Sequence, residues 1–261
     1  MASDKAASSS TSRIPETVGD FPSTGRIVIP IYGSPQSALD TLSDEFDVVA
    51  WDAPGSGQSS DVPDTFRIAD YAGYLAGFIQ ELRLERPHVL GLSFGSTLAL
   101  ELYRQNRALP RTLILASAYA RWAGSLPPEV VEQRVRQTIP DLDRPPPQVV
   151  ARYNSPGLLT ESAPPALLEE NAAIMSDFRS AGMKTMVRAI AEADLRTVLP
   201  DINVPTLLLY GDKDVRSPLK VAETLHAQIP TSKLVVMPGV GHLCNFEAPD
   251  RFNSEVRGFL R

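Results

Sequence analysis

Short runs of hydrophobic residues alternate with amphipathic stretches along most of the chain, from about residue 26 onward. In the stretch 70–84, for example, apolar side chains recur at helical spacing behind Asp70, a candidate N-cap. This alternation is typical of βαβ units, and runs that are apolar on both faces suit parallel strands covered by helices on both sides. The pattern predicts an α/β fold with a mostly parallel sheet of about six strands. The strand-like runs are 26–32, 46–51, 88–92, 112–116, 206–210 and 233–237.

Residues 121–185 interrupt this alternation. They hold prolines at 127–128, 145–147 and 164–165, with helical stretches between them and no strand-like run. An insertion of this kind between two sheet strands favours a helical lid over the carboxyl edge of the sheet, and an irregular surface excursion is the alternative. We therefore expect a core of residues 26–120 and 186–261, a lid of residues 121–185, and a flexible Ser/Thr-rich tail of residues 1–25.

Composition narrows the classes of function. The 261 residues are 43% hydrophobic and 21% charged, with a net charge of −6 and no block of like charges, so we expect no nucleic-acid partner. No apolar run approaches the roughly 18 residues of a membrane helix. The first residues lack the apolar core of a signal peptide, and the expected location is the cytosol. A single cysteine, Cys244, and three histidines outside any H-x-x-x-H arrangement predict no internal disulfide and no metal site.

The most specific motif is the sequence Gly-Leu-Ser-Phe-Gly at 91–95. It follows an apolar strand-like run and opens an apolar helix, which is the context in which G-x-S-x-G forms a nucleophile elbow. Ser93 would then stand exposed on a strained turn. The amide of Phe94, at the start of the helix, would point at a developing oxyanion. The alternative is a chance match in a strand–helix turn.

A serine hydroxyl needs a base to become a nucleophile at neutral pH, and three histidines are candidates. His226 lies in the middle of a predicted helix, on a face open to solvent or half-buried. His88 begins the strand that leads to Ser93, about 16 Å away in an extended chain. His242 lies in a Gly-Val-Gly-His loop after the last strand, at the edge where Ser93 emerges. His242 is therefore the predicted base.

The base needs an orienting acid, and the loop after the run 206–210 offers two aspartates. In the chain order Ser…Asp…His, the acid follows this preceding strand. Asp212 and Asp214 both lie there, and the residues alone leave the choice between them open.

These motifs together resemble the α/β-hydrolase superfamily over residues 26–261. The matching pieces are the elbow at 91–95, Asp-Ala-Pro-Gly-Ser-Gly-Gln-Ser at 52–59, Gly-Asp-Lys-Asp at 211–214, and Gly241-His242 with Glu247 and Pro249 behind. The resemblance implies that Asp214 is the acid, that the 52–59 loop is structural, and that no cofactor is required. A serine at position 93 excludes the aspartate nucleophile of epoxide hydrolases and haloalkane dehalogenases.

The chain departs from this family near its start. Most relatives have His-Gly after the first parallel strand, whereas this chain has Tyr32-Gly33-Ser34, so the backbone amide of Ser34 is the expected second oxyanion donor. The usual N-terminal hairpin is predicted to be missing. The run 46–51 then becomes an edge strand, through which the chain would self-associate unless the tail covers it. Pro30, inside a central strand, predicts a local bulge.

The predicted activity is hydrolysis of a small-molecule ester, lactone or related carbonyl compound through an acyl-enzyme on Ser93. The alternatives are an aminopeptidase or amidase of proline iminopeptidase type, with Glu169 and Glu170 as candidate amine-binding acids, and a non-catalytic binding protein. Cys244 is expected to be a small buried apolar side chain rather than a nucleophile. Candidate residues for an apolar substrate pocket, which would equally pack the lid on the body, are Tyr32, Trp122, Tyr153, Met175 and Phe178.

Overall fold

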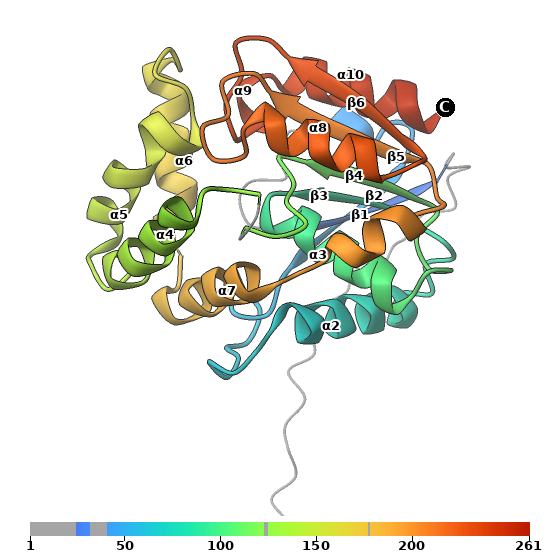
Figure 1. The fold of residues 1–261 in the computed structure, drawn as a ribbon, viewed down its shortest axis with the longest axis horizontal. Helices are drawn as coiled ribbons and strands as arrows, with labels where there is room; N and C mark the ends of the chain where they lie inside the picture. Colours follow the sequence, from blue (N-terminus) through green and yellow to red (C-terminus); the bar gives the residue numbers. More distant parts are fainter. Residues whose placement is uncertain (1–24, 32–40, 123–124, 177) are drawn as a thin grey trace, which may run out of the picture.

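Six parallel strands form one open sheet at the centre of the molecule (Figure 1). The computed structural model describes residues 25–31, 41–122, 125–176 and 178–261. The strand order is β2-β1-β3-β4-β5-β6, so the prediction of an α/β fold with a mostly parallel sheet of about six strands is confirmed. The strands are β1 (Arg26–Ile31), β2 (Asp47–Asp52), β3 (His88–Leu92), β4 (Thr112–Ala116), β5 (Thr206–Gly211) and β6 (Ser232–Met237).

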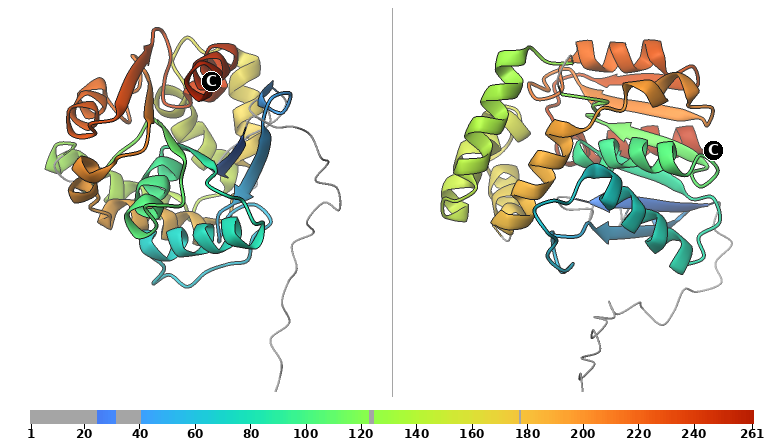
Figure 2. Two further views of the ribbon diagram at one scale, coloured as in Figure 1. Left: turned by 90° about the vertical axis from the view of Figure 1, so that its right-hand side faces the viewer. Right: turned by 60° about the horizontal axis from the view of Figure 1, so that its bottom comes forward.

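Helices cover both faces of the sheet, because the central strands are apolar on both faces. Successive residues of β4 alternate between two hydrophobic cores: Leu113 and Leu115 belong to one, Ile114 and Ala116 to the other. The first core includes helices α2, α3 and α8, and the second includes α9 and α10 (Figure 2). These helices are α2 (Ile68–Glu81), α3 (Phe94–Gln105), α8 (Leu219–Gln228), α9 (Cys244–Glu247) and α10 (Pro249–Leu260).

The start of α2 corrects one prediction. Asp70 is not the N-cap but the third residue of the helix, where its carboxylate accepts a hydrogen bond of 2.8 Å from the backbone amide of Arg67. The side chain of a first-turn residue thus reaches back to the cap, which is Arg67, three residues before the predicted one. At the other end, Arg83 adopts a φ of 51°, which breaks the helical path.

The proline-rich insertion is helical, and its prolines explain where the helices begin. α4, α5 and α6 each start at a proline that follows another proline, a position where the missing amide hydrogen costs nothing. The insertion lies beyond the carboxyl ends of the strands (Figure 1). Its elements are α4 (Pro128–Asp141), α5 (Pro146–Tyr153), the π-helix η1 (Asn154–Leu158), α6 (Pro165–Met175) and α7 (Ser180–Glu192), followed by the 3-10 helix η2 (Arg196–Asp201).

Hydrogen bonds join the insertion to loops at this edge. The Arg179 side chain donates to the backbone carbonyls of Ser56 and Ser59, in the loop after β2. The amide of Leu243, in the loop after β6, donates to the carbonyl of Leu158 at 3.0 Å. The insertion therefore contacts both outer parts of the carboxyl edge.

Strand β2 stands at one end of the strand order. Within the described residues its sheet neighbour is β1, which pairs with it at six positions, from Arg26 opposite Asp47 to Ile31 opposite Asp52. β1 pairs with β3 only at Ile27 and Val28, so that pairing ends before Pro30, which has no amide hydrogen to donate. The edge position predicted for the run 46–51 is confirmed for this part of the chain. Apart from Gly25, the predicted tail lies outside the described residues.

Among the helices that the structure describes, none is long and apolar enough to cross a membrane.

Candidate active site

Ser93 occupies a strained turn between β3 and α3. Its backbone has a φ of 52° and a ψ of −109°, a combination that costs energy for any residue with a side chain. Strand and helix approach so closely here that a Cβ at Gly91 would overlap the carbonyl oxygen of Gly95. Packing therefore requires a glycine at position 91, and the turn presents Ser93 between strand and helix.

Hydrogen bonds hold this turn on the neighbouring strand. The amide of Ser93 donates to the carbonyl of Ala116, the last residue of β4, at 2.9 Å. The buried hydroxyl of Ser96 bonds to the carbonyls of Gly91 and Ala116, at 2.6 and 2.9 Å. The strained conformation is thus supported from both β3 and β4.

His242 lies after β6 and faces a carboxylate. Its Nδ1 is 2.9 Å and 3.1 Å from the two carboxylate oxygens of Asp214, in the loop after β5. Both residues are buried, with exposed fractions of 2% for His242 and 5% for Asp214. We call these two residues the Asp214–His242 pair.

The carboxylate of Asp214 is held in its charged form. Its Oδ1 accepts hydrogen bonds of 2.8 Å from the backbone amides of Arg216 and Ser217. Burial acts to raise the pKa of Asp214, but the His242 ring and the two amides outweigh burial and lower that pKa below its ordinary value. Asp212 lies elsewhere in the same loop, where its Oδ1 accepts a 2.6 Å bond from the amide of Gly239. Of the two candidate acids, the structure brings Asp214 to His242.

The end of β4 connects the pair to Ser93. Ser117 follows Ala116 directly, and its buried hydroxyl donates to the backbone carbonyl of His242 at 2.8 Å. Ser93 and His242 are therefore bonded to consecutive residues of the same strand end. Among the described residues, Ser93 Oγ has no hydrogen bond, to His242 or to any other group. Bonds between a nucleophile and its base often tighten only when substrate is present.

One of the two predicted oxyanion donors is described. Phe94 is the first residue of α3, so its amide belongs to the first helical turn, where backbone N–H groups lack carbonyl partners within the helix. The positive end of the helix dipole adds to its attraction for an anion. Ser34, the other predicted donor, and Tyr32, a predicted pocket residue, lie outside the described residues.

The other predicted pocket residues lie in or beside the insertion. Trp122 is buried against the ring of Tyr119. Tyr153 is half-buried, and its hydroxyl donates to the carboxylate of Asp141 at 2.9 Å. Met175 and Phe178 are both half-buried near the end of α6. Contact of these four residues with a substrate stays a prediction.

The remaining histidines and the cysteine have other surroundings. His88 Nδ1 lies 2.8 Å from the Thr112 hydroxyl, and burial lowers the pKa of His88 to about 4. His226 is exposed and bonds to the hydroxyl of Ser232 at 2.8 Å. Burial raises the pKa of Cys244 to about 12, so its thiol stays protonated at neutral pH and is a poor nucleophile.

Two supporting residues have no role predicted from the sequence. Ser117 carries no motif, although its place directly after β4 puts it at the carboxyl edge. Glu247 belongs to a motif of the family, but its contacts are not predicted. Its carboxylate accepts bonds from the amide of Thr160 at 2.7 Å and from the amide of Gly241 at 2.5 Å, which ties the His242 loop to the insertion. The acidic residue five positions after His242 was the available signal.

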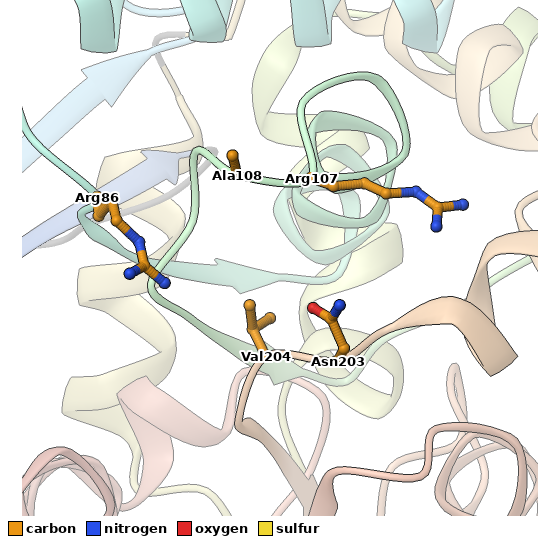
Figure 3. A pocket seen from close by; sticks show the side chains of 5 residues that line it. All are labelled: Arg86, Arg107, Ala108, Asn203 and Val204. Carbon is orange, nitrogen blue, oxygen red and sulfur yellow. The ribbon is translucent and has the colours of Figure 1, made fainter.

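A hollow on the molecule lies away from these residues. It opens at the amino ends of the strands, opposite the edge that holds Ser93 (Figure 3). The hollow is lined by Arg86, Arg107, Ala108, Asn203 and Val204.

In the part of the chain that the structure describes, no group of three or more His, Cys, Asp or Glu side chains is arranged to hold a metal ion.

Known proteins resemble this chain over most of its length. The sequence model described as "Alpha/beta hydrolase family" matches residues 31–255. A protein of Cronobacter turicensis named "Putative carbamate hydrolase RutD" is 30% identical over 222 residues, covering 82% of this chain and 80% of that protein. The 3-oxoadipate enol-lactonase 1 of Acinetobacter baylyi is 25% identical over 231 residues, with 88% and 84% covered. A solved thermophilic esterase from Thermogutta terrifontis superposes with a TM-score of 0.81 at 29% identity, over 92% of this chain and 90% of that one.

Proposed function

Since the chain belongs to the alpha/beta hydrolase family, we propose that it is a serine hydrolase that cleaves a small-molecule ester, lactone or related carbonyl compound. The observation that carries the proposal is the arrangement around the end of β4. A strained serine and a buried histidine–carboxylate pair are bonded there to consecutive residues, Ala116 and Ser117. These are the three groups that acyl transfer through a serine requires.

In the proposed reaction, Ser93 Oγ attacks the substrate carbonyl carbon while His242 Nε2 accepts the hydroxyl proton. Asp214, bonded to Nδ1, holds the ring in the tautomer that leaves Nε2 free, and it stabilises the imidazolium that forms. The amides of Phe94 and Ser34 donate to the oxyanion. His242 then returns its proton to the leaving alkoxide, and an acyl-enzyme on Ser93 remains.

Water completes the cycle by the same steps. His242 takes a proton from water, the hydroxide oxygen bonds to the acyl carbon, and the released Ser93 oxygen regains a proton from the imidazolium. The products are a carboxylic acid and the free enzyme. No group outside the protein and water is needed for these proton and acyl transfers.

Ester or lactone cleavage is the best supported reaction class. An esterase and an enol-lactonase are among the relatives that this chain resembles. The aminopeptidase alternative requires an acid that binds the substrate amine, and Glu169 and Glu170 are both exposed on α6. We propose that the insertion α4–α7 acts as a lid above this reaction, because it contacts loops at the carboxyl edge.

Burst kinetics test the acyl-enzyme. With 4-nitrophenyl acetate, we expect a rapid release of nitrophenolate, close to one equivalent per protein, followed by slower steady turnover. The Ser93→Ala variant should show neither phase, while an aminoacyl anilide should be a much poorer substrate of the wild type. Ester turnover without a burst in any attainable time range, and unchanged in Ser93→Ala, would contradict the proposal.

A further inference from the structure

Two arginines approach each other beside Asp214 without a carboxylate of their own. Arg134 lies on α4, and Arg216 lies in the loop after β5. Arg134 donates from Nη1 to the Tyr119 hydroxyl at 3.2 Å and from Nη2 to the backbone carbonyl of Arg216 at 2.9 Å. Among the described residues, neither guanidinium forms an ion pair. The positive charge of Arg134 acts on that of Arg216, in a chain whose net charge is −6.

Neighbouring arginines of the insertion are paired. The guanidinium groups of Arg144 and Arg152 both lie on the carboxylate of Asp141, at 3.1 and 2.8 Å. The insertion therefore supplies acids to arginines near its outer surface. It supplies none, within the described residues, to Arg134 or Arg216.

Each of the two guanidinium groups lies over an aromatic ring. Arg134 Cζ is 5.6 Å from the centre of the Trp122 ring, and Arg216 Cζ is 5.9 Å from the centre of the Tyr153 ring. A guanidinium over an aromatic face is held by a cation–π interaction, and its N–H groups lie along its edge, where a planar anion can accept from them. The side chain of Arg216 makes no hydrogen bond to any described residue.

A third donor accompanies the arginines. Trp122 is 7% exposed, and its indole Nε1 has no hydrogen-bond partner among the described residues. A buried N–H without a partner is costly, and a bound ion or water is one of the ways in which such a group is satisfied. Burial, and after it the charge of Arg134, lower the pKa of Arg216, so the Arg216 cation bears an electrostatic cost that an anion would relieve.

We propose that Arg134, Arg216 and Trp122 form a subsite for a carboxylate group carried by the substrate. This inference rests on the proposed ester or lactone hydrolysis. The backbone of Arg216 lies next to the proposed catalytic pair, because its amide donates to the Asp214 carboxylate that contacts His242. The preferred substrates are therefore esters or lactones with a second, ionised acid group. The competing account is that the two arginines only fasten α4 to the β5 loop.

Matched pairs of aryl esters test the subsite. One pair carries the charge on the acyl side, as mono-4-nitrophenyl adipate against 4-nitrophenyl hexanoate. The other carries it on the alcohol side, as 4-carboxyphenyl acetate against 4-carbamoylphenyl acetate. For at least one pair, wild-type kcat/KM should favour the anionic member about 10- to 100-fold, the range for a hydrogen bond to a charged group. Free adipate should inhibit cleavage of the hexanoate ester competitively.

Variants identify the donors. Arg216→Met and Arg134→Met should each reduce the anionic-to-neutral ratio of kcat/KM toward one and weaken inhibition by adipate, whereas Arg216→Lys should retain part of both. Arg136→Met is the matched control, because Arg136 lies on the same helix, is exposed and pairs with Glu132. It should change neither the ratio nor the rates. Thermal melts establish that each variant is folded.

Each outcome has one meaning. Equal rates for both members of both pairs in the wild type overturn the subsite and leave the hydrolase proposal standing. A ratio that survives in folded Arg216→Met and Arg134→Met also overturns it and assigns the arginines to structure. Failure to cleave any of the four esters overturns the proposed function and the subsite with it. If the methionine variants do not fold, the wild-type ratio and the adipate inhibition still decide.

Discussion

A buried histidine lies at the amino ends of the strands and another at their carboxyl ends, and the two differ in the group that each is bonded to. At the carboxyl edge, His242 Nδ1 faces the carboxylate of Asp214 at 2.9 Å. At the amino edge, His88 Nδ1 faces the hydroxyl of Thr112 at 2.8 Å. The same ring nitrogen is therefore bonded to a charged group at one edge and to a neutral group at the other. The two histidines are almost equally buried, with exposed fractions of 2% for His242 and 3% for His88.

The partner determines what each ring can do. The carboxylate at Nδ1 gives His242 the partner that the base of the proposed reaction requires. A hydroxyl beside His88 offers no such charge, and burial lowers the pKa of His88 to about 4. His88 is thus a neutral packing residue at neutral pH. A buried, hydrogen-bonded histidine is not by itself a sign of catalysis. A buried histidine bonded to a buried carboxylate is a candidate for a catalytic base.

The largest expected effect of substitution is at the carboxyl edge. Asp214→Asn removes the carboxylate charge that faces His242 Nδ1, and in the proposed triad the loss of this acid should cost on the order of 10⁴ in kcat. Asp212→Asn is the matched control two residues away, because Asp212 bonds to the Gly239 amide rather than to His242. We expect Asp212→Asn to keep most of its activity. Steady-state ester hydrolysis measures both variants, and equal losses would show that the acid was chosen wrongly.

Part of this site could be predicted from the sequence. The elbow could be predicted, because its strand, glycines and helix are neighbours in the chain. Asp212 and Asp214 could not be separated by residues alone, since both follow β5, and the choice came from a resemblance. The structure separates them, because the amides of Arg216 and Ser217 fold the loop around Asp214.

Contacts between residues far apart in the chain could not be predicted from the sequence. The bond between Arg134 and the carbonyl of Arg216 joins positions 82 apart, and no local pattern encodes it. Ser117 was missed because a serine after a strand has no motif of its own. The sequence predicts Asp70 as the cap of α2 because aspartate favours both the N-cap and the first helical turn, and only the backbone distinguishes these positions.

The comparison of histidines also predicts a pH effect on stability. His88 has an ordinary pKa of 6.5 in the unfolded chain and a pKa of about 4 when folded. Between these values the unfolded chain binds more protons, so the His88 contribution to stability is full above about pH 6.5 and is lost as pH falls toward 4. The urea midpoint of the wild type should therefore drop between pH 7.5 and pH 5.

The variant His88→Gln keeps a hydrogen-bonding group near Thr112 and removes the titrating ring. Its urea midpoint should depend less on pH than that of the wild type, and ester hydrolysis at pH 7.5 should be retained. The control is His226→Gln, because His226 is exposed. The same pH dependence in His88→Gln as in the wild type would show that other groups cause the loss of stability in acid.

The smallest expected effect concerns the contact between the insertion and the loop after β2. A Cβ at Gly182, in α7, would overlap the carbonyl oxygen of Gly55, in the loop after β2. Gly182→Ala should cost about 1–3 kcal/mol in the free energy of unfolding, as overpacking does. Gly77→Ala, on α2 with open space around it, should instead stabilise by about 0.4–1 kcal/mol. Urea denaturation measures both, and equal effects would show that the Gly182–Gly55 contact does not hold the insertion.

The most direct test of the account is to label the wild-type protein with a fluorophosphonate and map the adduct by mass spectrometry. The reagent phosphonylates a serine that a neighbouring base activates. We predict one adduct, on Ser93, absent from Ser93→Ala and formed far more slowly in Asp214→Asn than in Asp212→Asn. An adduct on another residue, or no adduct on a folded protein, would contradict the assignment of Ser93 as a nucleophile served by the Asp214–His242 pair.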